Sequence, residues 1–307
     1  MKTASIRLAL VAVAAVTFSA LPRASAEPEE PREGNFRVLT HNVFYGFSRE
    51  GEPHHARWLE WMAEMAPDVV SLQELNGYTA ERLAAEAEAW GHPHSVILKE
   101  EGFPTGLTSR WPLETVERRR EGFQHGLLRA KVRGVYVYAI HFHPSDWEHR
   151  IREAALLAED IASLPEEDPL VVLAGDFNGF SPSDRARYEQ DSELVPFFER
   201  LDARNPRARN LNEGRIDYGG IQAILDQGFV DLHARFRDPA ATFQGTFPSE
   251  LVSHQDHGPD RRLDYIFASA NLLDRVRAVE LVRDEETARF SDHFPVVADF
   301  ELEPTKE

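Results

Sequence analysis

Four apolar segments of the chain each end on a polar residue, and each is typical of a β-strand buried in a sheet. The segments, residues 36–41, 68–73, 135–140 and 169–175, are rich in Val, Leu and other apolar residues. The polar residues that follow them are Asn42, Glu74, His141 and Asp176, with Asn178 two positions further on. Ligands in layered α/β proteins collect at the carboxyl ends of strands. We therefore expect these side chains to line one site.

Two later segments carry the opposite order, with polar residues before an apolar run. Asp264 precedes residues 265–267, and Asp292 and His293 precede residues 294–297. A strand that runs antiparallel to the first four begins at the edge where they end, so these residues are expected to join the same site. Oxygen ligands outnumber histidines and cysteine is absent, which favours Mg²⁺, with Mn²⁺ or Ca²⁺ as alternatives, over Zn²⁺.

Apolar spacing and end signals predict helices between these strands. The predicted helices cover residues 57–66, 78–90, 145–163 and 218–227. Ser145 and Glu148 form a capping box at the start of the third helix. Residues 127–132 and 135–142 are predicted to form a hairpin, and residues 205–215 a surface loop.

The N-terminus has the pattern of a secretory signal peptide, predicted to cover residues 1–26. Lys2 and Arg7 precede the apolar run 8–21, and small residues at 24–26 match a cleavage site. The apolar run is shorter than the ~20 residues that a membrane-spanning helix needs. We therefore expect an exported protein, periplasmic or secreted, without a transmembrane segment.

The rest of the chain is expected to form one domain. Residues 27–34 read as a Pro/Glu-rich linker, and residues 35–303 show no shift in composition that would divide them. The chain has no cysteine, so export would come without disulfides and stability would depend on the core. We expect a monomer.

The charge of the chain is strongly acidic, with 34 basic and 52 acidic residues and a net charge of −18. Residues 1–26 contain three basic residues and no acidic ones, so the remainder has 31 basic against 52 acidic residues, or −21. Proteins that hold long DNA usually carry a basic face. The basic runs 118–120 and 204–209 are interpreted as solvated surface. This balance favours a small-molecule or lipid phosphoester over duplex DNA.

Six segments in order along the chain carry a family resemblance. They are residues 40–43, 71–75, 141–143, 175–178, 262–267 and 291–296. Together they resemble the endonuclease/exonuclease/phosphatase superfamily, which includes pancreatic-type DNases, abasic-site endonucleases, neutral sphingomyelinases and inositol-polyphosphate 5-phosphatases. The resemblance spans residues 35–303 and is greatest to the secreted bacterial DNase and sphingomyelinase branches. It implies a DNase I-like, four-layer α/β/β/α sandwich of two mixed β-sheets flanked by helices.

The resemblance also implies divalent-metal-dependent hydrolysis of a phosphoester by direct attack of water. Glu74 matches the metal ligand of the family, with Asn42 as a neutral partner. Asp292 would bind the metal or brace the site. His293 matches the general base, since a histidine can accept a proton at neutral pH, and Asp264 would orient its ring.

Other residues are expected to contact the phosphate. Asn178 and His141 match phosphate-contacting or leaving-group residues, and Asp176 is an alternative to His293 as the base. The abasic-endonuclease branch has a tyrosine where this chain has His141. It also has an acidic residue where this chain has Phe44, which weakens an interpretation with two metal ions. Arg110 is a further candidate for phosphate binding.

Several functions remain open at the level of sequence. The leading hypothesis is an exported phosphodiesterase or phosphatase that acts on a small molecule or a phospholipid head group. A secreted metal-dependent endonuclease is the alternative. A catalytically inactive binding module of the same fold is a third possibility, although the matching catalytic residues are all present.

Overall fold

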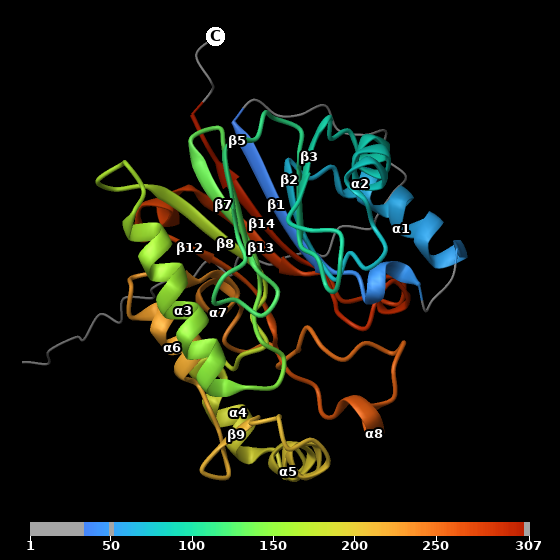
Figure 1. The fold of residues 1–307 in the computed structure, drawn as a ribbon, viewed down its shortest axis with the longest axis vertical. Coiled ribbons are helices and arrows are strands. Elements are labelled where there is room, and N and C mark those ends of the chain that lie inside the picture. The colour runs from blue at the N-terminus through green and yellow to red at the C-terminus, as the bar shows by residue number, and fades with distance from the viewer. Residues whose placement is uncertain (1–33, 49–51, 304–307) are drawn as a thin grey trace, which may run out of the picture.

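Two β-sheets packed face to face form the centre of the protein, and helices cover their outer faces (Figure 1). The computed structural model describes residues 34–48 and 52–303. The predicted signal peptide, and the predicted linker except Gly34, lie outside the described residues. The four-layer α/β/β/α arrangement confirms the predicted fold class.

The first sheet contains six strands and combines parallel and antiparallel pairs. In order across the sheet they are β13 (Val276–Leu281), β14 (Val296–Glu301), β1 (Asn35–Asn42), β2 (Val69–Gln73), β4 (Gly106–Ser109) and β3 (His94–Ile97). Strands β1 and β2 run parallel, and β14 runs antiparallel to β1. Asn42 therefore ends its strand at the edge where β2 ends, just before Glu74.

The second sheet also contains six strands. In order they are β11 (Val230–Asp231), β12 (Asp264–Ala268), β8 (Leu170–Asp176), β7 (Val135–His141), β6 (Leu127–Val132) and β5 (Glu114–Arg119). Strands β7 and β8 run parallel, whereas β12 runs antiparallel to β8. Both sheets are therefore mixed, as predicted.

Eight α-helices are described. They are α1 (Glu52–Met65), α2 (Ala80–Ala87), α3 (Trp147–Ala162), α4 (Arg185–Gln190), α5 (Leu194–Arg204), α6 (Gly219–Leu225), α7 (Leu232–Phe236) and α8 (His254–His257). Short 3₁₀ helices cover Tyr45–Phe47, Glu88–Trp90, Pro182–Asp184, Ala270–Arg275 and Thr287–Arg289. Helices α1 and α2 lie on the side of the first sheet, and α3 and α6 on that of the second (Figure 1). Within the described part of the chain, every helix is too short or too polar to cross a membrane.

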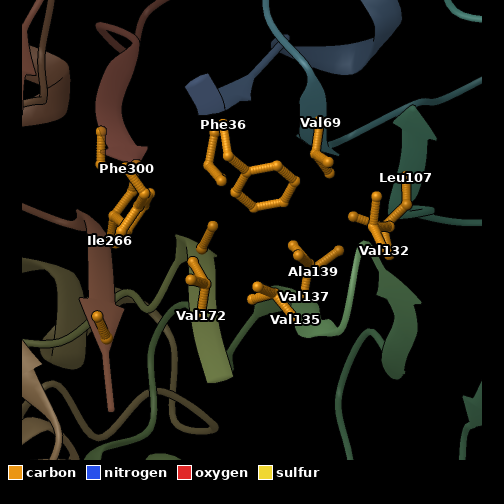
Figure 2. Close-up of a cluster of buried hydrophobic side chains, with 14 of the residues drawn as sticks. Phe36, Val69, Leu107, Val132, Val135, Val137, Ala139, Val172, Ile266 and Phe300 are labelled. Atoms are coloured by element: carbon orange, nitrogen blue, oxygen red, sulfur yellow. The ribbon is translucent and has the colours of Figure 1, made fainter. Parts of the chain in front are cut away.

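The core between the sheets explains why the strands read as continuous apolar runs. Phe36 and Val69 from the first sheet face Val137 and Val172 from the second (Figure 2). The alternate residues of β7, such as Tyr138, face away from the first sheet and pack under α3 and α6. Each central strand is thus buried on both faces, and apolar residues occupy both sets of alternating positions.

The helix boundaries differ from the predicted ones by a few residues. Helix α1 begins at Glu52, five positions before the predicted start, and α2 is shorter than predicted because its last turn is the 3₁₀ helix Glu88–Trp90. Asp146, not Ser145, caps α3, since its side chain accepts a hydrogen bond from the His149 N–H at 3.0 Å. A capping aspartate is as favourable as a serine, so local sequence did not distinguish the two.

Two connections test the loop predictions. The predicted hairpin joins β6 to β7 through Arg133 and Gly134, which both have positive φ, 50° and 82°. Such a two-residue turn matches the twist of antiparallel strands. The prediction of a surface loop over residues 205–215 is wrong at its end, because Leu211–Asn212 pairs with Arg215–Ile216 as a small antiparallel hairpin.

Candidate active site

The strand ends meet at one edge of the sandwich, and Asp176 lies at the centre of this edge. In the sheet register Asp176 pairs with His141 on one neighbouring strand and with Asp264 on the other. Asn42 joins the two sheets, since its Nδ2 donates a hydrogen bond to Asp176 Oδ2 at 3.1 Å. The predicted convergence of these residues is therefore present in the structure.

A close approach of two backbones brings His141 and Asp176 together. Gly175 has a φ of 154°, and a Cβ added to it would lie 2.0 Å from the Ile140 carbonyl oxygen. Only glycine fits at this point of contact between β7 and β8. The chain can thus present Asp176 directly beside the end of β7.

His293 contacts Asp264 directly and lies near two further carboxylates. Its Nδ1 lies 2.7 Å from Asp264 Oδ2, and its Nε2 lies 3.9 Å from Asp176 Oδ2 and 4.0 Å from Asp292 Oδ1. His141 Nε2 approaches Asp176 Oδ2 from another side, at 3.8 Å. Asp176 therefore lies beside two imidazole rings, with each Nε2 just beyond hydrogen-bond distance of its carboxylate.

The segment that carries Asp292 and His293 precedes β14, which begins only at Val296, so it is a loop and not the start of a strand as predicted. Ser291 fixes this loop, because its hydroxyl donates to the Asn42 carbonyl at 2.6 Å and accepts from the His293 N–H at 3.2 Å. Irregular backbone thus places His293 at the same edge that a strand start would have reached.

His41 holds the backbone of His293 through a hydrogen bond to its carbonyl oxygen. Trp58 Nε1 donates to His41 Nδ1 at 3.0 Å, so the proton of this ring is on Nε2, which lies 3.1 Å from the His293 carbonyl oxygen. Burial lowers the pKa of His41 to about 3, which keeps the ring neutral. No local pattern indicates this contact, because His41 and His293 are 252 positions apart in the chain.

Thr246 is a supporting residue that sequence reasoning missed. Its hydroxyl oxygen accepts hydrogen bonds from the backbone N–H groups of Leu263 and Asp264, at 2.9 and 3.0 Å, and its carbonyl accepts from the Phe294 N–H. It therefore ties the start of β12 to the loop of His293. A threonine among turn residues carries no sequence signal for such a role.

Glu74 and Asn42 form the other side of the site. Glu74 Oε2 accepts the Tyr45 N–H at 3.0 Å and Oε1 accepts Asn42 Nδ2 at 3.3 Å. Glu74, Tyr45 and Phe44 all have positive φ, at 59°, 53° and 41°. Such strained conformations persist where the surrounding contacts impose them, and they concentrate at functional sites.

Asn178 and Arg110 were both predicted to contact the phosphate, and only Asn178 lies in the site. Asn178 lies in the site, with its N–H bonded to Asp176 Oδ1 at 2.8 Å and its Nδ2 to the Phe142 carbonyl at 3.1 Å. Arg110 lies at the end of the first sheet opposite to the site, because it follows β4, which runs antiparallel to β2. Its Nε is 3.4 Å from Asp68, just before the start of β2. Arg110 is therefore not a member of the site.

Burial and like charges shift the protonation of the carboxylates. Burial raises the pKa of Asp176 to about 7, and the negative charge of Asp264 adds to this rise. Burial also raises the pKa of Asp292 to about 7, partly offset by His293 and reinforced by Glu74. The site thus holds more negative charge than its own residues neutralise.

The two histidines of the site are shifted in opposite directions. Burial disfavours a charge on His293, but attraction to Asp264 and Asp292 and the hydrogen bond to Asp264 outweigh it and raise the pKa to about 10. Burial and the nearby His125 and His293 hold the pKa of His141 well below its usual range. His293 is therefore a cation in this arrangement, and His141 is neutral.

This donor set fits a divalent cation. Asp176, Asp264 and His293 each place one ligand atom so that all three lie within 4.8 Å of one another. Asp264 Oδ1 is buried and has no hydrogen-bond partner among the described residues. Carboxylate oxygens in excess of cations suit a hard metal ion. This group differs from the predicted ligand set, in which Glu74 was central.

Comparison with known proteins identifies the class. The model of the endonuclease/exonuclease/phosphatase family matches residues 39–293, so this chain belongs to that family. Among individual proteins, it is 24% identical over 303 residues to the uncharacterized protein YbhP of Escherichia coli strain K12, with 90% of this chain and 100% of YbhP covered.

Solved structures agree on the fold. An AP endonuclease from Archaeoglobus fulgidus is similar with a TM-score of 0.63 and 20% identity, over 87% of this chain and 100% of that one. The 3′-5′ exonuclease NExo from Neisseria meningitidis is similar with a TM-score of 0.63 and 21% identity over the same shares. At these identities the likeness concerns the fold, which is the DNase I-like sandwich expected from the sequence.

Proposed function

We propose that this protein is an exported, Mg²⁺-dependent phosphoesterase that hydrolyses its substrate by direct attack of water. The observation that supports this function best is the position of Asp176. Its Oδ2 lies 3.8 Å from His141 Nε2 and 3.9 Å from His293 Nε2, and His293 is bonded to Asp264 at 2.7 Å. A phosphate oxygen or a water molecule between these groups would meet both a proton acceptor and hydrogen-bond donors.

Glu74 would hold the cation, with Asn42 and Asp292 beside it. The group of Asp176, Asp264 and His293 is the less suitable place, because His293 is bonded to Asp264 at 2.7 Å and protonated, and an imidazolium cannot be a metal ligand. The cation supplies charge neutralisation on the phosphate oxygens and polarises the phosphoester when bound. The negative charge of Glu74 contributes to the raised pKa of Asp292, and a cation bound beside both carboxylates would relieve this repulsion. Mn²⁺ or Ca²⁺ would fit the same oxygen ligands.

Asp176 is the group proposed to take the proton of the attacking water. The sequence left His293 and Asp176 as alternatives, and their pKa values favour Asp176. A base works best when its pKa is near the working pH, and the pKa of Asp176 is about 7. His293, with a pKa of about 10, would instead donate a hydrogen bond to the phosphate as an imidazolium.

His141 would contribute a neutral hydrogen-bond donor. Its Nδ1 is buried without a partner among the described residues. A buried N–H without an acceptor is costly, so the proton belongs on Nε2, which faces Asp176. From there it would donate to a phosphate oxygen. Asn178, held by Phe142, would contact the phosphate from the neighbouring turn.

Two substrate classes remain in competition. A small-molecule or lipid phosphoester is the primary proposal, because the net charge of −18 disfavours a long polyanion. A nuclease is the second candidate, because structures of similar fold include an AP endonuclease and a NExo 3′ phosphatase bound to a product DNA hairpin.

The decisive experiment is hydrolysis by purified residues 27–307 in Mg²⁺, Mn²⁺ or Ca²⁺, with EDTA as the metal-free control. The substrates would be bis-(p-nitrophenyl) phosphate, phosphoinositides, sphingomyelin and plasmid DNA. Cleavage confined to small or lipid esters supports the primary proposal, and nicking of the plasmid supports the nuclease. A protein that binds these substrates but turns over none of them would be the inactive module. Reaction of a chiral phosphorothioate diester tests direct water attack, since a single displacement inverts the configuration at phosphorus and a covalent intermediate would retain it.

Export and a monomeric state are further parts of the proposal. The features of residues 1–26 support export, and expression of the full chain in a bacterial host with sequencing of the exported N-terminus tests it. A product that begins at Glu27 is expected. Light scattering during size-exclusion chromatography tests the monomer.

A further inference from the structure

His141 is held in its orientation by a ring contact and not by a hydrogen bond. Its Nδ1 has no hydrogen-bond partner among the described residues, and its Nε2 is 3.8 Å from Asp176, beyond hydrogen-bond distance. Histidines at reactive centres are usually oriented through the second ring nitrogen. The ring of His125 lies parallel to that of His141 instead, with centroids 3.9 Å apart and an angle of 21° between the planes.

His125 comes from the loop between β5 and β6, outside every motif that indicated the site. Its ring is buried, with 6% of the residue exposed. It also contacts the ring of Phe103 in a T-shaped arrangement, with centroids 5.4 Å apart and an interplanar angle of 66°. No hydrogen bond of the His125 ring occurs among the described residues, so the ring is held by its aromatic neighbours.

Glu153 links the two loops that carry these rings. It lies on α3, is fully buried, and accepts the Gln124 N–H at 2.8 Å and the His143 N–H at 2.7 Å. Gln124 directly precedes His125, and His143 follows His141 by two positions. One carboxylate thus sets the separation of both backbones, and hence the stacking distance of the two rings.

We propose that His125 is a positioning residue for His141, which acts through ring stacking and not through a bond to the substrate. This inference rests on the proposed phosphoesterase function, in which His141 Nε2 donates to a phosphate oxygen. Without the stacked ring, His141 would be free to rotate about its side-chain bonds. The fraction of molecules with Nε2 in place would then fall, and the turnover rate would fall with it.

Three variants separate the ring from its nitrogens. His125→Phe keeps an aromatic ring, His125→Asn keeps a polar side chain without one, and His125→Ala removes both. Aromatic pairs contribute enough to change an equilibrium by up to about tenfold. The expected result is a loss of kcat of about tenfold for Ala and Asn with KM nearly unchanged, and kcat for Phe within about threefold of the wild type.

His92→Ala is the matched control, since His92 is a buried histidine of the first sheet that contacts Pro67 and Thr108 and not the site. Its kcat should stay at the wild-type level even if its melting temperature falls. Equal losses in Phe and Ala, with Asn near the wild type, would show that a polar group of His125 contacts the substrate and would overturn the proposal. Unchanged kcat in all three would overturn it as well. If the Ala variant does not fold, the Phe and Asn variants decide.

NMR of the His141 ring protons provides a second measurement that does not depend on activity. The ring of His125 shifts these resonances. We therefore expect a clear change of chemical shift in His125→Ala and His125→Asn, and a smaller change in His125→Phe. Unmoved His141 resonances in Ala would refute the stacking. If the wild-type protein hydrolyses no phosphoester, the proposed function fails while this measurement still tests the contact.

Discussion

The imidazole of His293 lies 2.7 Å from the carboxylate of Asp264, although the two residues are 29 positions apart in the chain. Both are buried, and each is fixed by a second contact, Asp264 through its N–H to Thr246 and His293 through its carbonyl to His41. Because the contact is built from both sides, it defines the ring orientation and charge of His293 before any substrate arrives.

Substitution of Asp264 tests this pair. In Asp264→Asn the side-chain shape remains, but the carboxylate that orients Nδ1 and stabilises the imidazolium is lost. We expect kcat/KM to fall on the order of 10³-fold, as for other histidine–aspartate pairs, with an unchanged circular dichroism spectrum. Asp274→Asn, an exposed aspartate, is the control and should keep full activity. A loss of less than tenfold would mean that the pair is only structural.

The metal proposal is tested at Glu74. Glu74→Gln keeps a side chain that can accept the Tyr45 N–H but removes the negative charge. We expect the Mg²⁺ concentration for half-maximal activity to rise and kcat to fall by about 10²-fold, because outer and inner ligands of metal sites have effects of this order. Calorimetric titration with Mn²⁺ measures the affinity directly. Glu81→Gln, an exposed glutamate, is the control. Identical Mn²⁺ affinities in both variants would remove Glu74 from the metal site.

The pH dependence distinguishes the two candidate bases. With Asp176 as the base, kcat/KM should rise about tenfold per pH unit below its pKa of about 7, as the carboxyl group loses its proton, and then level off. It should fall again above about pH 10, where His293 loses its proton. With His293 as the base, the rate would instead keep rising up to about pH 10. A pH–rate profile on bis-(p-nitrophenyl) phosphate, whose charge does not change over this pH range, with fixed Mg²⁺ gives the answer.

His92 should make the protein less stable in acid. Its Nε2 lies 2.8 Å from the Pro67 carbonyl and its Nδ1 2.8 Å from the Thr108 hydroxyl, and burial lowers its pKa from 6.5 to about 4. The folded state thus binds fewer protons than the unfolded state between these values, and stability is lost as pH falls through this window. The contribution reaches about 3 kcal/mol at pH 4.

Denaturant unfolding of the wild type and of His92→Asn at several pH values measures the pH-dependent contribution of His92 to the free energy of unfolding. The variant should be less stable at pH 7, because two buried hydrogen bonds are disturbed, and the difference should shrink toward pH 4. A difference that is constant with pH would show that His92 does not resist protonation. His94→Asn, at the half-buried start of β3, is the control.

Arg262 anchors the segment before Asp264. Its guanidinium is buried and bonds Asp184 at 2.6 Å and Asp231 at 2.6 Å. Arg262→Met leaves the buried Asp231 without its arginine partner and Asp184 with Arg237 alone, and we expect a loss of about 3–5 kcal/mol in the free energy of unfolding. Arg277→Met removes an exposed pair with Glu301 and should cost no more than about 1 kcal/mol. Equal effects of the two substitutions would contradict this account.

Local sequence was sufficient for the strands that carry the site. The segments before Asn42, Glu74, His141 and Asp176 are apolar at consecutive positions because both faces of each strand are covered. Such runs end where the chain leaves the two-sided core, so a polar residue there marks the edge. Element boundaries were misplaced, as at Asp146, because neighbouring polar residues cap a helix equally well, and the small hairpin within residues 205–215 was missed.

Arg110 shows where a linear pattern fails. It was a candidate for phosphate binding from its sequence alone, but it follows β4, which runs antiparallel to β2, and so lies at the opposite end of the strands. Strand direction depends on which strands pair, and pairing is set by contacts far apart in sequence. The sequence alone could not place Arg110.

The sequence by itself determined the group of polar residues at the strand ends, since periodicity is a local property, and its six motifs determined the resemblance that implied the family and the layered fold. Tertiary structure decided the charges and the supporting contacts. The opposite pKa shifts of His293 and His141, the support from Thr246 and the ring contact of His125 arise from burial and from distances between segments remote in the chain. Electrostatic energy and packing depend on those distances, and no pattern along the chain records them.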